Sequence, residues 1–191
     1  MVGKFRKFVR RLGYDISPFP GSAPHWERLI NSLSLHDIDC VFDIGANTGQ
    51  YARAIRTNGY AGRIVSFEPL SGIRDELERH ATTDPLWEIA PRTAVGATSG
   101  EVEINISGET NMSSILSLDA TAHARLASTR AETSEKVAVT TVAAALDAHG
   151  AGAKNLFLKS DTQGYEAEVL DGIGDAWAQI AGLQLELSIQ P

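Results

Sequence analysis

Short apolar segments alternate with amphipathic segments along the chain from residue 39 onward. The apolar runs have the length of buried strands, and the segments between them place apolar residues at helical spacing. Strands that alternate with helices pair in parallel through right-handed crossovers. The pattern predicts strands at residues 40–43, 62–67, 86–90, 102–106, 137–142, 155–159 and 183–189, and helices at 24–33, 49–57, 71–80, 165–170 and in a segment that ends near residue 150.

This order of elements predicts an α/β fold with an open, doubly wound and mostly parallel sheet. Residues 102–106 alternate apolar and polar side chains, so they are expected to form one arm of a hairpin. Ser71 is the expected N-cap of the helix that follows it. Ligands of such sheets bind at the carboxyl ends of the strands, so the candidate chemistry is sought directly after each strand.

Two parts of the chain differ in composition. Residues 24–191 are expected to form the α/β domain, whereas residues 1–23 form a basic arm and an irregular connector. Residues 2–12 are predicted to form an amphipathic helix whose cations either contact anionic lipid headgroups or remain solvated while the helix packs on the domain. The formal net charge of −7 argues against a nucleic-acid partner.

The sequence also bears on the cellular compartment. It contains no uncharged apolar stretch of about 18 residues and no secretory signal, which indicates a cytoplasmic protein, either free or peripheral at the inner face of the membrane. Cys40 is the single cysteine, so the chain can form neither an intramolecular disulfide nor a cysteine-rich zinc site.

A segment containing glycines follows the strand at 40–43. It reads Asp43-Ile44-Gly45-Ala46-Asn47-Thr48-Gly49-Gln50-Tyr51, and Glu68-Pro69 follows the next strand. Glycines allow a tight turn and a close approach of a ligand to the backbone. Glu68 lies 25 residues after Asp43, where an acid can accept hydrogen bonds from ribose hydroxyls. The two segments together predict an adenosine-type ligand.

Two features discriminate between adenosine ligands. Asn47 occupies the position of the middle glycine of a dinucleotide fingerprint, so a β-carbon stands where pyrophosphate would approach the backbone. Asp43 adds a negative charge, which opposes pyrophosphate and suits the ammonium and sulfonium groups of S-adenosylmethionine. We therefore expect S-adenosylmethionine rather than NAD, with Glu68 and Pro69 at the ribose. The predicted contacts of the methionine end are Asp43, Gly45, Ala46, Asn47, Gly49, Gln50 and Tyr51.

The strand at 155–159 ends in Lys159-Ser160-Asp161. Asp161 is the candidate acceptor of a substrate proton or a ligand of a divalent ion, and its structural alternative is a helix cap. Glu166 could do the same chemistry or could occupy the first helical turn, where acids are favoured. Lys159 either binds a substrate oxygen or pairs with an acid.

Three further positions carry weaker signals. Asn111 and Ser113 lie in a polar segment that either contacts the substrate or only connects two elements. Glu186 interrupts an apolar run, and it either joins Asp161 in a site or faces solvent. A divalent metal is not favoured, because the candidate ligands are all oxygen atoms and their spacing along the chain does not identify a metal site.

Three segments carry a resemblance to a known family. Residues 42–51, 67–69 and 158–166 resemble the FkbM-type S-adenosylmethionine-dependent methyltransferases, and the resemblance spans about residues 39–190. It implies a class I methyltransferase fold, which is Rossmann-like, and O-methylation of a hydroxyl on a sugar or a polyketide-type product. Ser160 departs from the aliphatic residue expected at its position.

The resemblance implies that the sugar of a glycolipid or polysaccharide is the preferred acceptor, and the basic arm favours a glycolipid at an anionic membrane surface. The class I fold normally continues into a sixth and a seventh strand, so we expect either a truncated chain or a sheet edge that a partner covers. Two other functions stay open. One is a non-catalytic module that binds S-adenosylmethionine, and the other is an NAD-dependent oxidoreductase.

Overall fold

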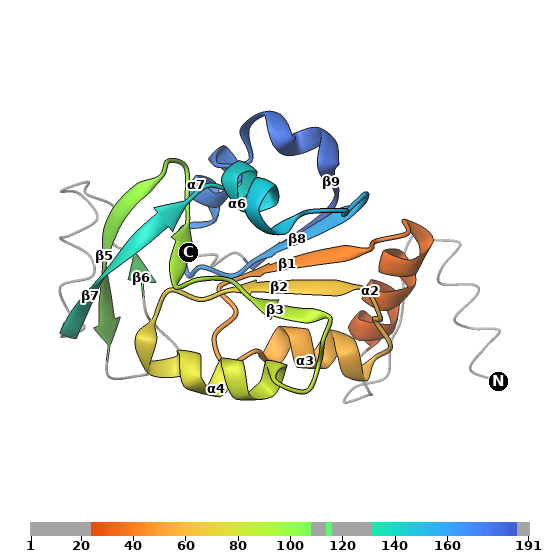
Figure 1. Ribbon diagram of the computed structural model, residues 1–191, viewed down its shortest axis with the longest axis horizontal. Coiled ribbons are helices and arrows are strands. Elements are labelled where there is room, and N and C mark those ends of the chain that lie inside the picture. The colour runs from red at the N-terminus through yellow and green to blue at the C-terminus, as the bar shows by residue number, and fades with distance from the viewer. Residues whose placement is uncertain (1–23, 108–113, 116–130, 187–191) are drawn as a thin grey trace, which may run out of the picture.

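The computed structural model describes residues 24–107, 114–115 and 131–186 (Figure 1). The predicted basic arm at residues 2–12 lies outside the described residues, as do the predicted substrate-binding residues Asn111 and Ser113.

A five-stranded parallel sheet forms the centre of the fold and confirms the predicted α/β class. The strand order reverses direction between the first strand of the chain and the strand that ends at Ser160, which makes that position the topological switch point. In the order in which they lie side by side, the strands are β3 (Trp87–Ile89), β2 (Arg63–Phe67), β1 (Cys40–Ile44), β8 (Leu156–Ser160) and β9 (Ile180–Leu185).

Helices cover both faces of this sheet, as a doubly wound fold requires (Figure 1). Successive side chains of a strand point to opposite faces, so each central strand contributes to two cores. Phe42 packs with Leu146 on one face, whereas Val41 packs with Ile55 on the other. The first face carries α6 (Val142–His149), α7 (Glu166–Asp171) and the 3-10 helix η1 (Gly174–Gln179), and the second carries α2 (Pro24–Leu35), α3 (Gln50–Thr57) and α4 (Ser71–Ala81).

A second, four-stranded sheet lies beyond the carboxyl ends of the parallel strands (Figure 1). The predicted hairpin arm is part of its strand β5, which pairs antiparallel with both of its neighbours. Its small core contains Ala94, Ile104 and Val137. The strands of this sheet, in spatial order, are β4 (Thr93–Val95), β7 (Ala131–Thr140), β5 (Gly100–Ser107) and β6 (Ser114–Ile115).

Several predicted boundaries are wrong, and each error has a local cause. Strand β4 was not predicted at all, because its three residues are too few to show an alternating pattern. Strand β9 begins at Ile180 rather than at residue 183, because Ile180 and Gly182 both pair with β8, with a register shift between them at Ala181. The N-cap of α4 is Leu70 rather than Ser71. The hydroxyl of Ser71 instead donates to Glu135 Oε1 at 2.8 Å, which ties α4 to the second sheet.

No helix in the described part of the chain is long and apolar enough to cross a membrane.

Gly172 allows the end of α7 to lie directly against the loop after β4. A β-carbon at Gly172 would overlap the carbonyl oxygen of Gly96. We expect Gly172→Ala to lower the free energy of unfolding by about 1–3 kcal/mol, as overpacking does in a well-packed site. Urea denaturation measures this change.

Gly72 provides the matched control for Gly172. It lies in α4, and a β-carbon there meets no atom within 4 Å. Gly72→Ala should leave the stability unchanged or raise it by up to about 1 kcal/mol, because alanine favours the helix. Equal stabilities of the two variants would contradict the close approach of Gly172 and Gly96.

Candidate active site

Two cavities open at the carboxyl ends of the parallel strands, on either side of the turn Gly45–Asn47. The first cavity is the narrower one, with a volume of about 90 Å³, and it lies between this turn, the loop after β2 and the second sheet. The second cavity has a volume of about 520 Å³ and lies between the turn, α2 and the ends of β8 and β9. Gly45, Asn47 and Asp161 line both cavities, so these residues mark the junction between them.

The turn after β1 has the backbone conformation that its glycines predict. Gly45 has φ 73° and Asn47 has φ 50°, both in the left-handed region. A side chain at Gly45 would overlap the carbonyl oxygen of Asp161, so β1 and β8 can approach only because residue 45 is glycine. Asparagine tolerates this conformation better than most residues, and the Oδ1 atom of Asn47 accepts a hydrogen bond from the backbone N–H of Thr48 at 2.7 Å.

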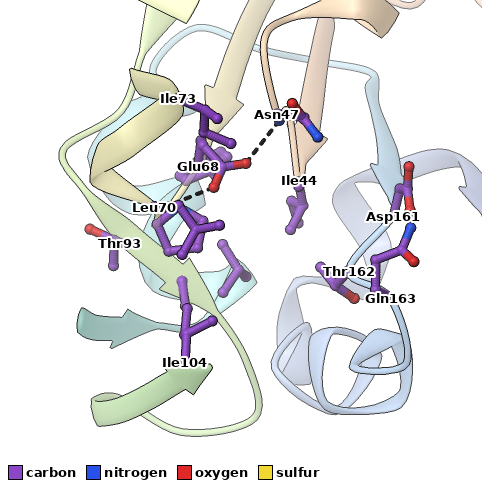
Figure 2. Close-up of a pocket in the computed structure, with 15 residues that line it drawn as sticks. Ile44, Asn47, Glu68, Leu70, Ile73, Thr93, Ile104, Asp161, Thr162 and Gln163 are labelled. Atoms are coloured by element: carbon purple, nitrogen blue, oxygen red, sulfur yellow. Dashed lines mark hydrogen bonds between the residues drawn. The ribbon is translucent and has the colours of Figure 1, made fainter. Parts of the chain in front are cut away.

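Glu68 lies at the wall of the first cavity, where the sequence places an acid for ribose hydroxyls. Its side chain is 4% exposed, and burial raises the pKa of its carboxyl group, although two backbone hydrogen bonds oppose the rise. The N–H of Asn47 donates to Oε2 at 2.8 Å, and the N–H of Leu70 donates to Oε1 at 2.9 Å (Figure 2). Each carboxylate oxygen keeps a second lone pair that a ligand hydroxyl can use.

The first cavity has two chemically different walls (Figure 2). Leu70, Ile73 and Ile104 give one side an apolar surface beside Glu68. Thr162 and Gln163, which follow β8, lie with Asp161 on the opposite side. A ligand with a flat apolar ring and a hydroxylated ring beside it matches this division.

Asp43 is not among the residues that line either cavity, so its predicted contact with the ligand stays a prediction. Its side chain is 0% exposed, and its Oδ1 atom lies 2.9 Å from the Nζ atom of Lys159. The cause is the strand register, because Asp43 is paired with both Lys159 and Ser66 on its neighbouring strands. In-register residues of neighbouring parallel strands point to the same face of the sheet. The carboxylate charge is therefore neutralised within the sheet.

Lys159 links the buried Asp43 to the turn after β1 and to the second cavity. It is 5% exposed, and its ammonium group donates to the carbonyl oxygen of Gly45 at 3.2 Å. The same nitrogen lies 3.9 Å from Asp161 Oδ2 and 5.3 Å from the centre of the Tyr51 ring. Of the two roles considered for Lys159, the structure shows the pairing with an acid, and the side chain also lines the second cavity.

Ser66 links the buried Asp43 to Trp87 on β3. The indole N–H of Trp87 donates to Ser66 Oγ at 2.9 Å, and Ser66 Oγ lies 3.5 Å from Asp43 Oδ2. This chain of polar contacts gives the buried aspartate a second partner, as a charged group in an apolar core requires.

Asp161 stands at the junction of the two cavities with a side chain that is 25% exposed. The side-chain N–H of Gln163 donates to Asp161 Oδ1 at 3.0 Å. The helix-cap alternative for Asp161 does not hold, because α7 begins at Glu166 and its N-cap is Tyr165. A negatively charged Asp161 raises the pKa of Glu186, which also lines the second cavity, and burial and a hydrogen bond between the two side chains add to this effect.

Glu166 is turned away from both cavities. Its carboxylate accepts hydrogen bonds from the backbone N–H groups of Thr162 at 2.9 Å and Gly164 at 3.0 Å, and from the hydroxyl of Thr162 at 3.1 Å. The residue is 6% exposed. The structure therefore shows Glu166 holding the loop between β8 and α7, and its predicted catalytic role stays a prediction without a contact in either cavity.

The remaining predicted cofactor contacts divide between the cavities. Pro69 lines the first cavity, whereas Ala46, Gln50 and Tyr51 line the second. Gly49 lines neither cavity, because it is the N-cap of α3 and its α-carbon packs against the ring of Trp87.

Sequence reasoning missed several cavity residues. His25, Trp26 and Leu29 of α2 belong to no recognisable motif, and Gln184 could be found only from its register partner Lys159 on β8. Across the described ranges, no three histidine, cysteine, aspartate or glutamate side chains gather closely enough to hold a metal ion.

A family model described as the methyltransferase FkbM domain matches residues 43–188. The match begins at Asp43, and it includes the turn, Glu68, Asp161 and all of β9. A search of curated proteins found no match. The parallel sheet with helices on both faces is thus the Rossmann-like fold of a methyltransferase.

Lys159→Met would leave the Asp43 carboxylate buried without its cation. We expect this variant to lose about 3–5 kcal/mol of unfolding free energy, as the breaking of a buried ion pair does. The double variant Asp43→Asn with Lys159→Met removes both charges and should recover most of the loss. Urea denaturation compares the variants.

Lys154→Met serves as the control, because Lys154 is an exposed lysine just before β8. Its effect should stay below about 0.5 kcal/mol. If the loss of unfolding free energy in the double variant equalled the summed losses of Asp43→Asn and Lys159→Met, Asp43 and Lys159 would not be coupled.

Proposed function

This chain belongs to the FkbM methyltransferase family, and we propose that it transfers a methyl group from S-adenosylmethionine to a hydroxyl oxygen of a sugar on a glycolipid or polysaccharide. The single observation that carries the proposal is Asp161, a partly exposed carboxylate at the junction between the narrow cavity that contains Glu68 and a larger open one. A transfer between two bound molecules requires such a junction, with a proton acceptor beside it.

The first cavity fits the adenosine part of the cofactor. Glu68 supplies hydrogen-bond acceptors for the two ribose hydroxyls, and Leu70 and Ile73 supply an apolar surface for the base. Gly45 and Asn47 line both cavities, so a ligand that passes along this turn would reach Tyr51 in the second cavity.

The charge on the cavity surface supports a cationic nucleoside over a dinucleotide. Among the described residues that line the first cavity, Glu68 and Asp161 are acidic and none is basic. The ammonium group of Lys159 lies nearby, but its charge is paired with Asp43. A pyrophosphate would therefore meet carboxylates without a compensating cation.

The proposed reaction requires this chain to position the acceptor hydroxyl and to remove its proton. When bound, the cofactor supplies an electrophilic methyl group on a sulfonium. The residues of the junction would hold the acceptor hydroxyl beside the bound cofactor, so that its oxygen could accept the methyl group. The hydroxyl proton passes to Asp161 Oδ2, since Oδ1 already accepts a hydrogen bond from Gln163.

The experiment that tests the proposal has two parts. Calorimetry should show that the protein binds S-adenosylhomocysteine and does not bind NADH. Mass spectrometry of glycolipids and polysaccharides from cells with and without the gene should show a shift of one methyl group. Binding of NADH alone would support an oxidoreductase, and cofactor binding without any methyl shift would support a non-catalytic module.

Asp161→Asn keeps the shape of the junction but removes the proton acceptor. We expect this variant to bind S-adenosylhomocysteine with wild-type affinity and to lower the turnover number by about 10²–10⁴-fold, the usual contribution of a general base. Asp171→Asn changes an exposed aspartate at the end of α7, outside both cavities, and should keep full turnover. Wild-type turnover of Asp161→Asn would exclude Asp161 as the base.

We also propose that residues 2–12 hold the enzyme near an anionic membrane surface, where a glycolipid acceptor would lie. The support is the sequence, in which Lys4, Arg6, Lys7, Arg10 and Arg11 occur without an acid among them. Each basic residue near such a surface contributes about 1 kcal/mol. Deletion of residues 1–12 should therefore reduce cosedimentation with anionic liposomes and leave the weak binding to neutral liposomes unchanged. Equal sedimentation of both forms would dismiss the membrane contact.

A further inference from the structure

The second cavity has an aromatic wall in which two rings of α2 join Tyr51, a predicted cofactor contact. His25 and Trp26 lie at the start of α2 with ring centres 4.7 Å apart, and the Trp26 ring centre lies 5.7 Å from that of Tyr51 in α3. Leu29 continues this wall one helical turn further along α2. The indole of Trp26 is half-buried, so part of its surface borders the cavity.

Polar side chains from β8 and β9 line the same cavity. They are Asp161, Gln184 and Glu186, at or just beyond the carboxyl ends of the two strands. Burial raises the pKa of Tyr51, so its hydroxyl remains a donor, and it donates to Gln184 Oε1 at 3.1 Å. The side-chain NH₂ of Gln184 still has donors to offer, while the two carboxyl groups offer acceptors.

We propose that this cavity binds the acceptor sugar, with the indole of Trp26 packed against the C–H face of a pyranose ring and with Gln184 and Glu186 bonded to its hydroxyl groups. The inference rests on the proposed function and assigns its acceptor site. A pyranose ring has an apolar face of C–H groups and a rim of hydroxyls that both donate and accept. The aromatic wall of the cavity matches the C–H face of the ring, and its polar side chains match the hydroxyl rim.

Other acceptor chemistries fit less well. A fully apolar acceptor would take Gln184 and Glu186 out of water without giving them hydrogen-bond partners, which costs free energy. An anionic acceptor would meet the carboxylates of Asp161 and Glu186, while the nearby ammonium of Lys159 is already paired with Asp43. The cavity therefore favours a neutral sugar.

The size and position of the cavity agree with this role. Its volume of about 520 Å³ lies within the usual range for ligand pockets, so a sugar fits beside the methionine end of the cofactor. Asp161 lines both cavities, so a hydroxyl of a sugar held against Trp26 can reach the proton acceptor.

The test uses the full-length protein saturated with S-adenosylhomocysteine on an array of neutral and uronic-acid-containing oligosaccharides. We expect the wild type to bind neutral glycans in preference to acidic ones. Trp26→Ala should weaken that binding at least tenfold, and Trp26→Phe should retain most of it, because phenylalanine keeps an aromatic face. Calorimetry with S-adenosylhomocysteine should show less than a twofold change in all variants, which also shows that they are folded.

Trp177→Ala is the matched control. Trp177 lies in η1, is 50% exposed and lines neither cavity, so its removal should leave glycan binding unchanged. Equal glycan binding by Trp26→Ala and the wild type would overturn the inference, and so would a cofactor-loaded wild type that binds no neutral glycan. A wild type that does not bind S-adenosylhomocysteine at all would overturn the proposed function together with this inference.

Discussion

The buried ion pair between Asp43 and Lys159 is the interaction on which the site depends. It joins the carboxyl ends of β1 and β8, the two strands that flank the switch point of the sheet. The same ammonium group holds the carbonyl oxygen of Gly45, so the pair also fixes the turn that separates the two cavities. Two charges in the interior are stable only together, which means that neither residue can be replaced alone without a large cost.

This pair also decides which charges a ligand meets. Because Asp43 and Lys159 cancel each other beneath the turn, the ionisable groups at the surface of the first cavity are the carboxyl groups of Glu68 and Asp161. The two acids differ in their surroundings. Glu68 is held by two backbone N–H groups, whereas Asp161 is partly exposed and accepts a hydrogen bond from the side chain of Gln163. The first cavity thus contains one carboxylate that the backbone fixes and one that solvent reaches.

The second sheet and α2 give this chain its particular binding surfaces. Strands β4 and β5 supply the apolar side of the first cavity through Ala94, Val95 and Ile104. Helix α2 precedes the matched family region and supplies the aromatic side of the second cavity. The second sheet lies within the matched family region, whereas α2 lies outside it, and both elements shape what can approach Asp161.

The sequence by itself determined the fold class, the turn after β1 and the positions of Glu68 and Asp161. These features follow from local causes, namely the period of the apolar residues, the conformational freedom of glycine and the rule that ligands bind at strand ends. The tertiary structure alone decided which carboxylates face a ligand. Asp43 and Lys159 meet through strand register, Glu166 folds back onto its own loop, and Tyr51 reaches Gln184 from 133 residues away. The chain pattern cannot show such partners, because each depends on how distant segments align across the sheet.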